Sequence, residues 1–403
     1  MPRSVADAPV GAQGRVDCAP MWPPARPPFT TGRRRVLRAL GLAALAWPAA
    51  YARRRAASDP PTLRLLAHSR LPNGTEFKGT LVGGLSGLAY DPASELWYAL
   101  SDDRSRHAPA RCYVQRLPLV AGQPLRPEWV DVITLHGADG RPFPRQDVDP
   151  EALALRRDPA TGRASLLWTS EGNVRARIPP ALYESTLDGA LLRELRLPAR
   201  LRETGRPDRG PRHNKTLEGL TLTPDGRHAW VAMESALAQD DPTPAPGAPP
   251  GPCRFTHIDL ASGQADREVA YLPDPDPFGL ALPRGVASSG VAEILWRDTH
   301  RLWVLERAWS PATGVSARLY EADLERADDT LTIDTLRPGR YRPASKRLLL
   351  NLRDAGLPHV DNFEAMAWGP PLPGGRRSLV MCTDDNFNPL QVTQFAAFEV
   401  TSP

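Results

Sequence analysis

The chain has 403 residues, a formal net charge of +4 and four cysteines, and its length allows one large all-β domain or two ordinary ones. Residues 1–52 hold seven Arg and two Asp, so residues 53–403 carry a net charge of −1. A segment this close to neutral has no excess of basic residues, which excludes a nucleic-acid-binding protein with a large basic face.

The first 52 residues are typical of an export signal rather than of folded protein. The arginines Arg33–Arg35 precede the apolar run Ala39–Ala50, and Ala50-Tyr51-Ala52 has the small-x-small form of a cleavage site. Paired arginines followed by Val-Leu-Arg indicate the twin-arginine route. We expect a periplasmic or secreted protein with a linker at 53–61 and no permanent membrane span, because the apolar run is too short. Met21 is an alternative start.

A weak internal repeat runs through the rest of the chain. Five segments share one order of features: 85–103, 150–172, 217–235, 292–307 and 363–386. Each opens on a polar or acidic residue, alternates apolar residues, turns at a Pro-, Gly- or Asp-containing sequence, and ends a second apolar stretch near an acidic residue. This period-two alternation on both sides of a turn predicts five β-hairpins.

Most of these hairpins are followed by another pair of short apolar segments, so that each unit has four strands. Four strands repeated radially predict a β-propeller. The last unit supplies only Gln394–Val400 after its hairpin, and Thr62–Ser69 can complete it by pairing the N- and C-terminal strands. We predict an all-β propeller of five four-stranded blades, forming a single domain over residues 62–403. A sixth blade remains an alternative if the stretches near 236–290 or 330–360 contain one.

Acidic residues recur at the ends of these hairpins. In a propeller the first strand of each blade lines the central channel, so the acids that open strand one and close strand two should meet near one mouth of it. Ser86, Glu151, Glu218, Glu293 and Glu364 are the opening residues. Asp103 and Glu306 are also expected near this mouth. The predicted ligands of a divalent cation, most simply Ca²⁺, are Glu151, Glu171, Glu218, Glu234, Glu293, Glu364, Asp102, Asp384 and Asp385. Pairing with basic side chains is the alternative.

Basic residues lie close to these acids in the sequence. Arginine presents a planar donor group that suits phosphate. The predicted phosphate-binding set is Arg104, Arg212, Asn214, Lys215 and Arg307. The predicted catalytic set is Glu218, Glu151, Glu364 and His213, with a cation that activates water and polarises the phosphoryl oxygens. The motifs G-x-S-x-G, H-E-x-x-H and the P-loop do not occur, so a serine hydrolase is unsupported.

The cysteines give no metal site. Cys112, Cys253 and Cys382 are far apart and form no C-x-x-C pair. An oxidising compartment would permit one disulfide among them, and burial as small apolar residues is the alternative.

Several of these segments together resemble the phytase-like family, which is described as having esterase-like activity of the phytase type. The resemblance covers roughly residues 62–400. It is carried by SGLAYDPASELWYALSDDR, Asp149-Pro150-Glu151-Ala152-Leu153, Ser170-Glu171-Gly172, RHNKTLEGL from Arg212, Asn362-Phe363-Glu364, and Thr383-Asp384-Asp385-Asn386-Phe387. The fourth unit departs from it, because Ala292-Glu293-Ile294-Leu295 lacks the Glu-Gly-Leu form. The resemblance implies hydrolysis of phosphate esters.

Three functional hypotheses follow. The first is an exported, monomeric, metal-dependent hydrolase of small phosphoric esters that acts at the acidic channel. The second is a lactonase or carboxylic-ester hydrolase on the same propeller. The third is a non-catalytic propeller that binds a ligand and holds a structural cation.

Overall fold

The computed structural model describes residues 60–241, 249–275 and 288–401. Residues Ala57–Pro403 form one compact unit, and its regular structure is almost entirely β-strand. The export signal and nearly all of the 53–61 linker lie outside the described residues, so both remain predictions. Within the described ranges no helix has the length and apolar character that a membrane crossing requires.

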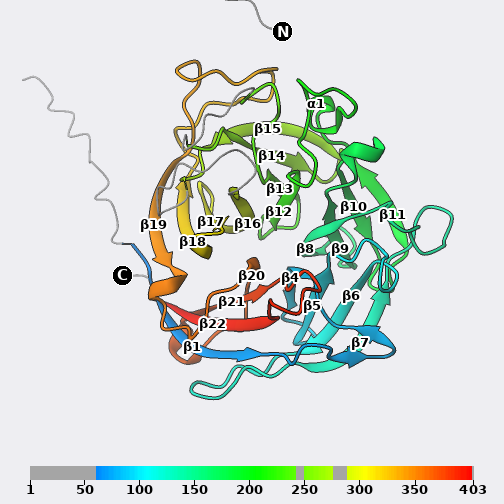
Figure 1. Cartoon of the computed structure of the whole chain (residues 1–403), viewed down its shortest axis with the longest axis vertical. Helices are drawn as coiled ribbons and strands as arrows, with labels where there is room; N and C mark the ends of the chain where they lie inside the picture. Colours follow the sequence, from blue (N-terminus) through cyan, green and yellow to red (C-terminus); the bar gives the residue numbers. More distant parts are fainter. Residues whose placement is uncertain (1–59, 242–248, 276–287, 402–403) are drawn as a thin grey trace, which may run out of the picture. The chain divides into compact units, whose positions relative to one another are not determined.

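Five antiparallel sheets of four strands each, the blades, are arranged around a central axis (Figure 1). Blade 1 contains β4 (Leu85–Asp91), β5 (Leu96–Ser101), β6 (Arg111–Arg116) and β7 (Glu128–Thr134). Blade 2 contains β8 (Pro150–Arg157), β9 (Ala164–Ser170), β10 (Ala181–Ser185) and β11 (Leu191–Leu195). Blade 3 contains β12 (Leu217–Leu222), β13 (His228–Met233), β14 (Cys253–Asp259) and β15 (Gln264–Tyr271).

The remaining two blades complete the ring. Blade 4 contains β16 (Ser288–Asp298), β17 (Arg301–Ser310), β18 (Gly314–Asp323) and β19 (Ser345–Asn351). Blade 5 contains β20 (Phe363–Trp368), β21 (Arg377–Thr383), β22 (Gln394–Thr401) and β1 (Thr62–Arg70). The innermost strands contact one another around the axis in the order β4, β8, β12, β16, β20 and back to β4. The predicted all-β propeller of five blades is therefore confirmed, and the described residues form no sixth blade.

The ring is closed by strands from the two ends of the folded unit. β1 pairs antiparallel with β22 from Thr62 opposite Thr401 to Arg70 opposite Gln394, with a bulge between Leu65 and Ala67. The predicted closure is thus confirmed. It supplies blade 5 with its outer strand and gives β22 a partner on each side, so that its backbone groups are not left at an open edge.

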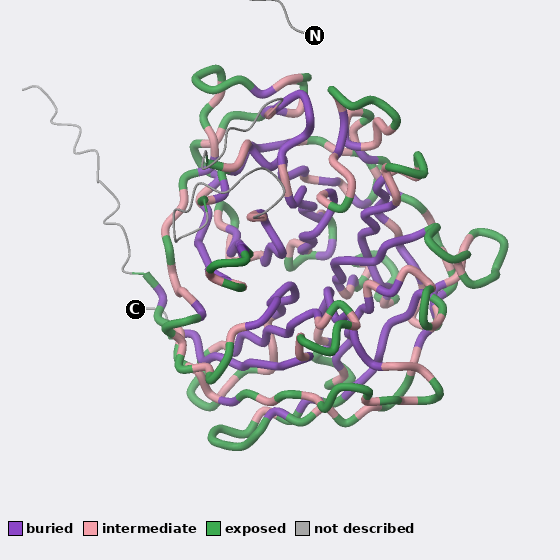
Figure 2. Tube along the Cα trace, in the orientation of Figure 1, coloured by how far each residue is buried: buried purple, intermediate pink, exposed green. Residues whose placement is uncertain are grey.

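Apolar residues fill the spaces between the blades rather than a single central core. Each of the five apolar clusters is built from two neighbouring blades; Trp97 of blade 1, for example, packs with Phe395 of blade 5. Trp168 and Trp303 are fully buried in the same way. Figure 2 shows the inner strands buried and the connecting loops exposed. Because each blade buries its faces against its neighbours, the blades depend on one another for stability.

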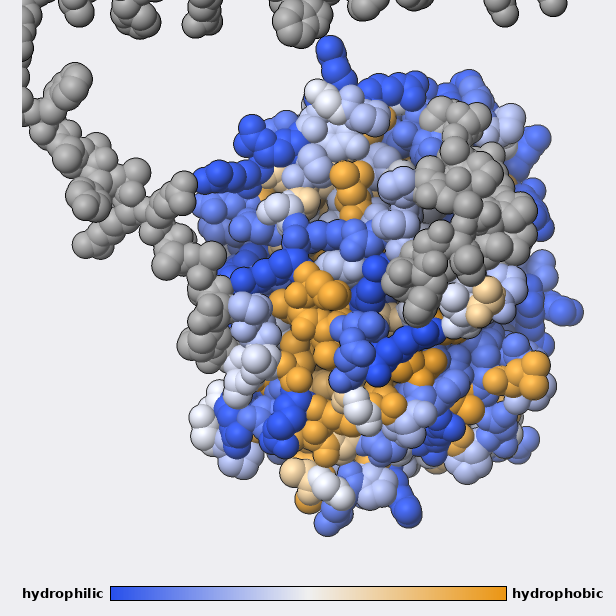
Figure 3. Space-filling model, turned by 60° about the vertical axis from the view of Figure 1, so that its left-hand side comes forward, coloured by the Kyte–Doolittle hydropathy of each residue, from blue (hydrophilic) through white to orange (hydrophobic). Residues whose placement is uncertain are grey.

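Small elements and surface features complete the unit. β2 (Glu76–Phe77) pairs with β3 (Thr80–Leu81), and the one α-helix among the described residues is the single turn α1 (Ala199–Arg202). Figure 3 brings the side of β19 forward and shows apolar groups at the surface there; Leu348 of β19 is 51% exposed.

The three cysteines of the described part are all buried and unpaired: Cys112, Cys253 and Cys382. This agrees with the alternative that they are buried as small apolar residues, and there is no disulfide among them. They fill space between blades as small apolar groups.

The closing strand offers a direct test of ring closure. Ala67 of β1 is buried against blade 1, whereas the neighbouring His68 is exposed. We expect Ala67→Asp to lower the free energy of unfolding by about 2–4 kcal/mol, because it buries an unpaired charge between blades. His68→Asp is the matched control and should change it by less than about 0.5 kcal/mol. Urea denaturation measures both, and equal effects would contradict closure by β1.

Candidate functional site

Each innermost strand contains a β-bulge, and in blades 1, 2, 3 and 5 the bulge carries the residue that opens the repeat. The hairpin register shifts between Leu85 and Gly87 in blade 1 and at the corresponding point in the other four blades. A bulge adds one unpaired residue and redirects its side chain. The residues at this position are Ser86, Glu151, Glu218, Ala292 and Glu364.

A second ring of side chains follows the second strand in blades 1, 2, 3 and 5 and lies within the second strand of blade 4. In blade 1, Leu85 pairs with Ser101, and the next residue, Asp102, donates its backbone N–H to the Gly84 carbonyl. The same arrangement recurs in blades 2, 3 and 5. By strand register, the residues at this position are Asp102, Glu171, Glu234, Arg307 and Asp384. Blade 4 therefore places Ala292 and an arginine where most other blades place carboxylates.

Glu293, predicted as a cation ligand, does not line the pocket. It lies one residue beyond the bulge, opposite Leu305, and its Oε1 accepts backbone N–H groups of Leu220 and Ile294, both at 2.8 Å. The bulge position of blade 4 is occupied by Ala292, one residue before the predicted Glu293. Because a one-residue shift moves a strand side chain to the other face, Glu293 points away from the channel. Glu293 therefore satisfies backbone donors between blades 3 and 4.

Glu306, predicted near the channel mouth, lies one residue before the ring position, which Arg307 occupies. It accepts hydrogen bonds from the Tyr271 hydroxyl at 2.7 Å and the Asp274 backbone N–H at 2.9 Å, and it pairs with Lys346. Asp103 likewise serves the structure, because its Oδ2 pairs with Arg111 at 2.7 Å. Among the described residues, neither Glu306 nor Asp103 belongs to a set of three carboxylates close enough to share a metal ion.

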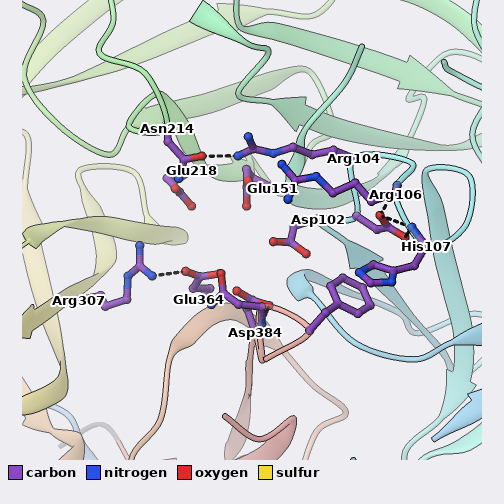
Figure 4. A pocket seen from close by; sticks show the side chains of 13 residues that line it. Asp102, Arg104, Arg106, His107, Glu151, Asn214, Glu218, Arg307, Glu364 and Asp384 are labelled. Carbon is purple, nitrogen blue, oxygen red and sulfur yellow. Dashed lines mark hydrogen bonds and ion pairs between the residues drawn. The ribbon is translucent and has the colours of Figure 1, made fainter. Parts of the chain in front are cut away.

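The two rings open into a pocket of about 260 Å³ at one mouth of the channel. Its lining is almost entirely polar. All five blades contribute to it, through residues of their inner strands and of the adjoining loops. The lining residues are Asp102, Asp103, Arg104, Arg106, His107, Glu151, Asn214, Glu218, Arg307, Glu364, Asp384, Asn386 and Phe387. Figure 4 shows the carboxylates of Glu151, Glu218, Glu364, Asp102 and Asp384 around one space.

Basic side chains neutralise part of this acidic ring. Arg307 pairs with Glu364 at 2.5 Å and lies 3.4 Å from Glu234. Lys215 pairs with Glu234 at 2.9 Å. Arg104 pairs with Asp149 and donates a hydrogen bond to Asn214 (Figure 4).

These pairs do not match all the acids. The eight carboxylates of this region are Asp102, Asp149, Glu151, Glu171, Glu218, Glu234, Glu364 and Asp384. Three basic side chains form ion pairs with them: Arg104, Lys215 and Arg307. In the described part of the chain, the Glu218 carboxylate has no hydrogen bond or ion pair, and Asp102 Oδ1 and Glu171 Oε2 are buried without accepting a hydrogen bond.

Two groups of carboxylates are close enough to share a cation. Asp149, Glu151 and Glu171 form one, and Glu171, Glu218 and Glu234 form the other; within each, one oxygen per residue lies within 4.8 Å of the others. Carboxylate oxygens are the ligands that Ca²⁺ and Mg²⁺ prefer. Buried oxygens without hydrogen bonds and an all-oxygen donor set fit a hard divalent cation, although the donor set does not choose between the two.

The pKa values of these acids show the electrostatic cost of gathering them. Burial, and then the nearby Glu234, raises the pKa of Glu218 well above its usual value. Burial and the neighbouring Glu218 do the same to Glu151. Burial raises the pKa of Asp149 to about 6, although Arg104 opposes it. Each group must therefore stay protonated or acquire a positive partner.

The basic groups respond in the opposite sense. Burial opposes the charge of Arg307, but Glu364 and Glu234 outweigh it and raise its pKa. Lys215 behaves in the same way beside Glu234. These residues are held as cations within the channel.

The structure brings together most of the predicted phosphate-binding residues, but not all of them. Arg104, Asn214 and Arg307 line the pocket. Lys215 is engaged by Glu234, and Arg212 donates to the Asp241 carbonyl.

Four further predicted residues are not among the pocket-lining residues: Glu171, Glu234, His213 and Asp385. Glu171 and Glu234 belong instead to the carboxylate groups that could share a cation. The pKa of His213 is lowered by burial and then by Arg175 and Arg104. Asp385 accepts backbone N–H groups of Gly84 and Phe387 and so fixes the loop after β21. A role for His213 or Asp385 in binding or catalysis remains a prediction.

Several residues of the site were missed from the sequence. Asp149 joins the first carboxylate group, and the Asp-Pro-Glu sequence that places two acids around one proline was a usable signal. Arg106, His107 and Phe387 lie in the loops that follow β5 and β21. Loop residues carry no strand periodicity, so only their closeness to Asp102 and Asp384 in the chain pointed to them.

A five-bladed propeller with a carboxylate- and arginine-lined pocket in its channel is the class that the fold and site define. The family model for phytase-like proteins, described as "esterase-like activity of phytase", matches residues 80–387. The chain therefore belongs to the phytase-like family, as the sequence predicted. No match to a curated protein was found.

Solved structures with similar folds are distant relatives at most. The Dos1 propeller is 6% identical with a TM-score of 0.34, covering 77% of this chain and 66% of that chain. An exo-β-1,3-galactanase from Phanerochaete chrysosporium is 8% identical with a TM-score of 0.45, covering 84% and 64%. A putative exo-β-1,3-galactanase from Bifidobacterium bifidum s17 is 10% identical with a TM-score of 0.41, covering 84% and 97%. The chain spans just under two thirds of the first two, and likenesses this weak say nothing about its reaction.

The corrected register predicts different outcomes for two glutamates. We expect Glu218→Gln to weaken Ca²⁺ binding at least about tenfold, because it removes a charged ligand. Glu293→Gln is the matched control and should leave Ca²⁺ affinity unchanged, since an amide oxygen still accepts the two backbone N–H groups. Titration calorimetry with Ca²⁺ measures both. Equal losses in the two variants would show that the acids of blade 3 do not form the site.

Proposed function

We propose that the protein is a divalent-cation-dependent hydrolase of phosphoric esters, acting in the channel pocket. The observation that carries this proposal is that candidate cation ligands and arginines line the same small pocket. Membership of a family described by phytase-like esterase activity supports it. The reaction adds water to the ester, breaks the bond between phosphorus and the alcohol oxygen, and releases the alcohol and a phosphate.

The chain's carboxylates would hold the cation. Glu171 belongs to both carboxylate groups, and Glu218 lacks any other partner in the described part of the chain. When bound, Ca²⁺ or a similar ion supplies Lewis acidity toward a phosphoryl oxygen and toward water. Binding there also gives the buried acids the positive charge that three basic side chains do not fully provide.

The arginines would bind the phosphoryl group. Arg104 and Arg307 project into the pocket from opposite sides (Figure 4). Arg106 also lines it, and no ion pair or hydrogen bond of its guanidinium occurs in the described residues. Guanidinium groups form short, directional hydrogen bonds with phosphate oxygens. Together they would orient the ester so that one face of the phosphorus meets the carboxylate side of the pocket.

These arginines favour phosphate over a neutral ester. A lactonase or carboxylic-ester hydrolase does not need several arginines at its substrate, because the ester group of that substrate is uncharged. A purely structural cation would not need an arginine beside it that is available to an anion. Arg106 is such a residue, because its guanidinium has no ion pair or hydrogen bond in the described residues. We infer further, on the basis of its predicted leader, that the protein is exported and acts outside the cytoplasm.

Hydrolysis of model esters tests the proposed function. With Ca²⁺ supplied, we expect turnover of para-nitrophenyl phosphate or its bis-ester, lost on chelation and in Glu218→Gln and retained in Glu293→Gln. Release of para-nitrophenol measures it. Turnover of lactones without any turnover of phosphoesters would contradict the proposal and favour the alternative hydrolase.

Arg106 tests phosphate recognition separately from cation binding. A charge-assisted hydrogen bond contributes about 1.5–3 kcal/mol, so Arg106→Gln should raise KM roughly 10- to 100-fold. Arg116, exposed at the end of β6 and absent from the pocket, provides the control Arg116→Gln, which should leave KM unchanged. Initial rates measure both, and Ca²⁺ affinity should remain normal. An unchanged KM in Arg106→Gln would remove Arg106 from the binding set.

A further inference from the structure

Two aromatic side chains from distant segments stack at the pocket. His107 follows β5 of blade 1, and Phe387 follows β21 of blade 5. Their ring centroids are 4.5 Å apart, with planes inclined by 26°. Both residues line the pocket, His107 being exposed and Phe387 half-buried. We call this pair the aromatic platform.

The backbone under the platform is strained. Asn386 and Phe387 have φ angles of +49° and +50°, in the left-handed region that a bulky residue rarely adopts. Such a conformation is unfavourable and persists where the surroundings determine it. Asp385 Oδ1 accepts the Phe387 N–H at 3.0 Å and also the Gly84 N–H at 2.9 Å, which ties the strained turn to blade 1.

Neighbouring residues leave room for the Phe387 ring and hold it in place. A Cβ atom at Gly84 would lie 2.6 Å from a ring carbon of Phe387, so the ring position depends on glycine there. The guanidinium of Arg111 lies 5.9 Å from the ring centroid, and Arg111 itself is buried and paired with Asp103. The Phe387 half of the platform is therefore held in place by the protein itself.

The position of the platform sets it apart from ordinary packing. The other lining residues are all polar or charged, so the apolar surface of the pocket is confined to this pair. A volume of about 260 Å³ exceeds that of a phosphoryl group, so the pocket also has room for part of the alcohol. The alcohol part of an ester whose phosphoryl group lies among the arginines can then lie against the apolar surface of this pair. A ring-shaped alcohol can stack there, because aromatic faces attract flat or ring-shaped groups.

We propose that the aromatic platform binds the alcohol part of the substrate and selects phosphate esters of ring-bearing alcohols over those of small flexible ones. This rests on the proposed function and deepens it. His107 and Phe387 would act on specificity and leave the cation site and the arginines unchanged.

Non-hydrolysable phosphonates test the platform without turnover. With Ca²⁺ present, the full protein should bind phenylphosphonate about tenfold more tightly than methylphosphonate, the upper range for an aromatic pair. Phe387→Leu and His107→Ala should each reduce this preference severalfold, with methylphosphonate affinity unchanged. Leu390, 89% exposed in the same loop and outside the pocket, supplies the control Leu390→Ala, which should keep the preference. Titration calorimetry measures all of these affinities.

The outcomes separate the platform from the underlying function. Equal binding of the two phosphonates by the wild-type protein would overturn the platform and leave phosphate recognition intact. Parallel losses for both phosphonates in Phe387→Leu would also overturn it, since the ring would then act on the whole pocket. Binding of neither phosphonate by the wild-type protein would overturn the proposed phosphate site, and the platform proposal with it.

Discussion

The structure depends on the electrostatics of carboxylates gathered out of water around one axis. Removing an ionised carboxylate from solvent is costly, and placing several within a few ångströms of one another adds mutual repulsion. Burial is accordingly the main cause of the raised pKa values of Glu151 and Glu218. A fold that keeps such a cluster ionised must supply positive charge. It does so partly with Arg104, Lys215 and Arg307, and a divalent cation fits the remainder.

The cluster is made by a local device repeated around the ring. A bulge in each inner strand and one residue at the corresponding register position on each second strand direct two side chains per blade toward the axis. Blade 4 departs from the rule, with Ala292 and Arg307 at these positions. These ring positions are therefore mostly acidic, with Arg307 as the one arginine among them. An arrangement of this kind can hold a cation and an anion side by side, as hydrolysis of a phosphate ester requires.

The hairpins, the five blades and the closing strand could be predicted from the sequence because they depend on local alternation and turn residues. Most of the ring acids followed from the same repeat. Glu293 was misplaced because a bulge adds one residue without leaving a clear mark in the sequence, and without Cα register Glu293 and Ala292 cannot be told apart. Arg106, His107 and Phe387 lie in loops, whose conformation depends on partners far away in the chain.

The sequence by itself determined the fold class and the kinds of side chain that line the channel, because period-two patterning is a property of neighbouring residues. Only the tertiary structure decided which acids share a cation, that Asp149 joins them, and that Arg212 bonds to a loop carbonyl instead. It also decided that two rings some 280 residues apart stack at the pocket. The carboxylate groups depend on how blades 2 and 3 pack, and the ring pair depends on how blades 1 and 5 meet when the ring closes. Distances across such junctions are set by packing rather than by any local pattern.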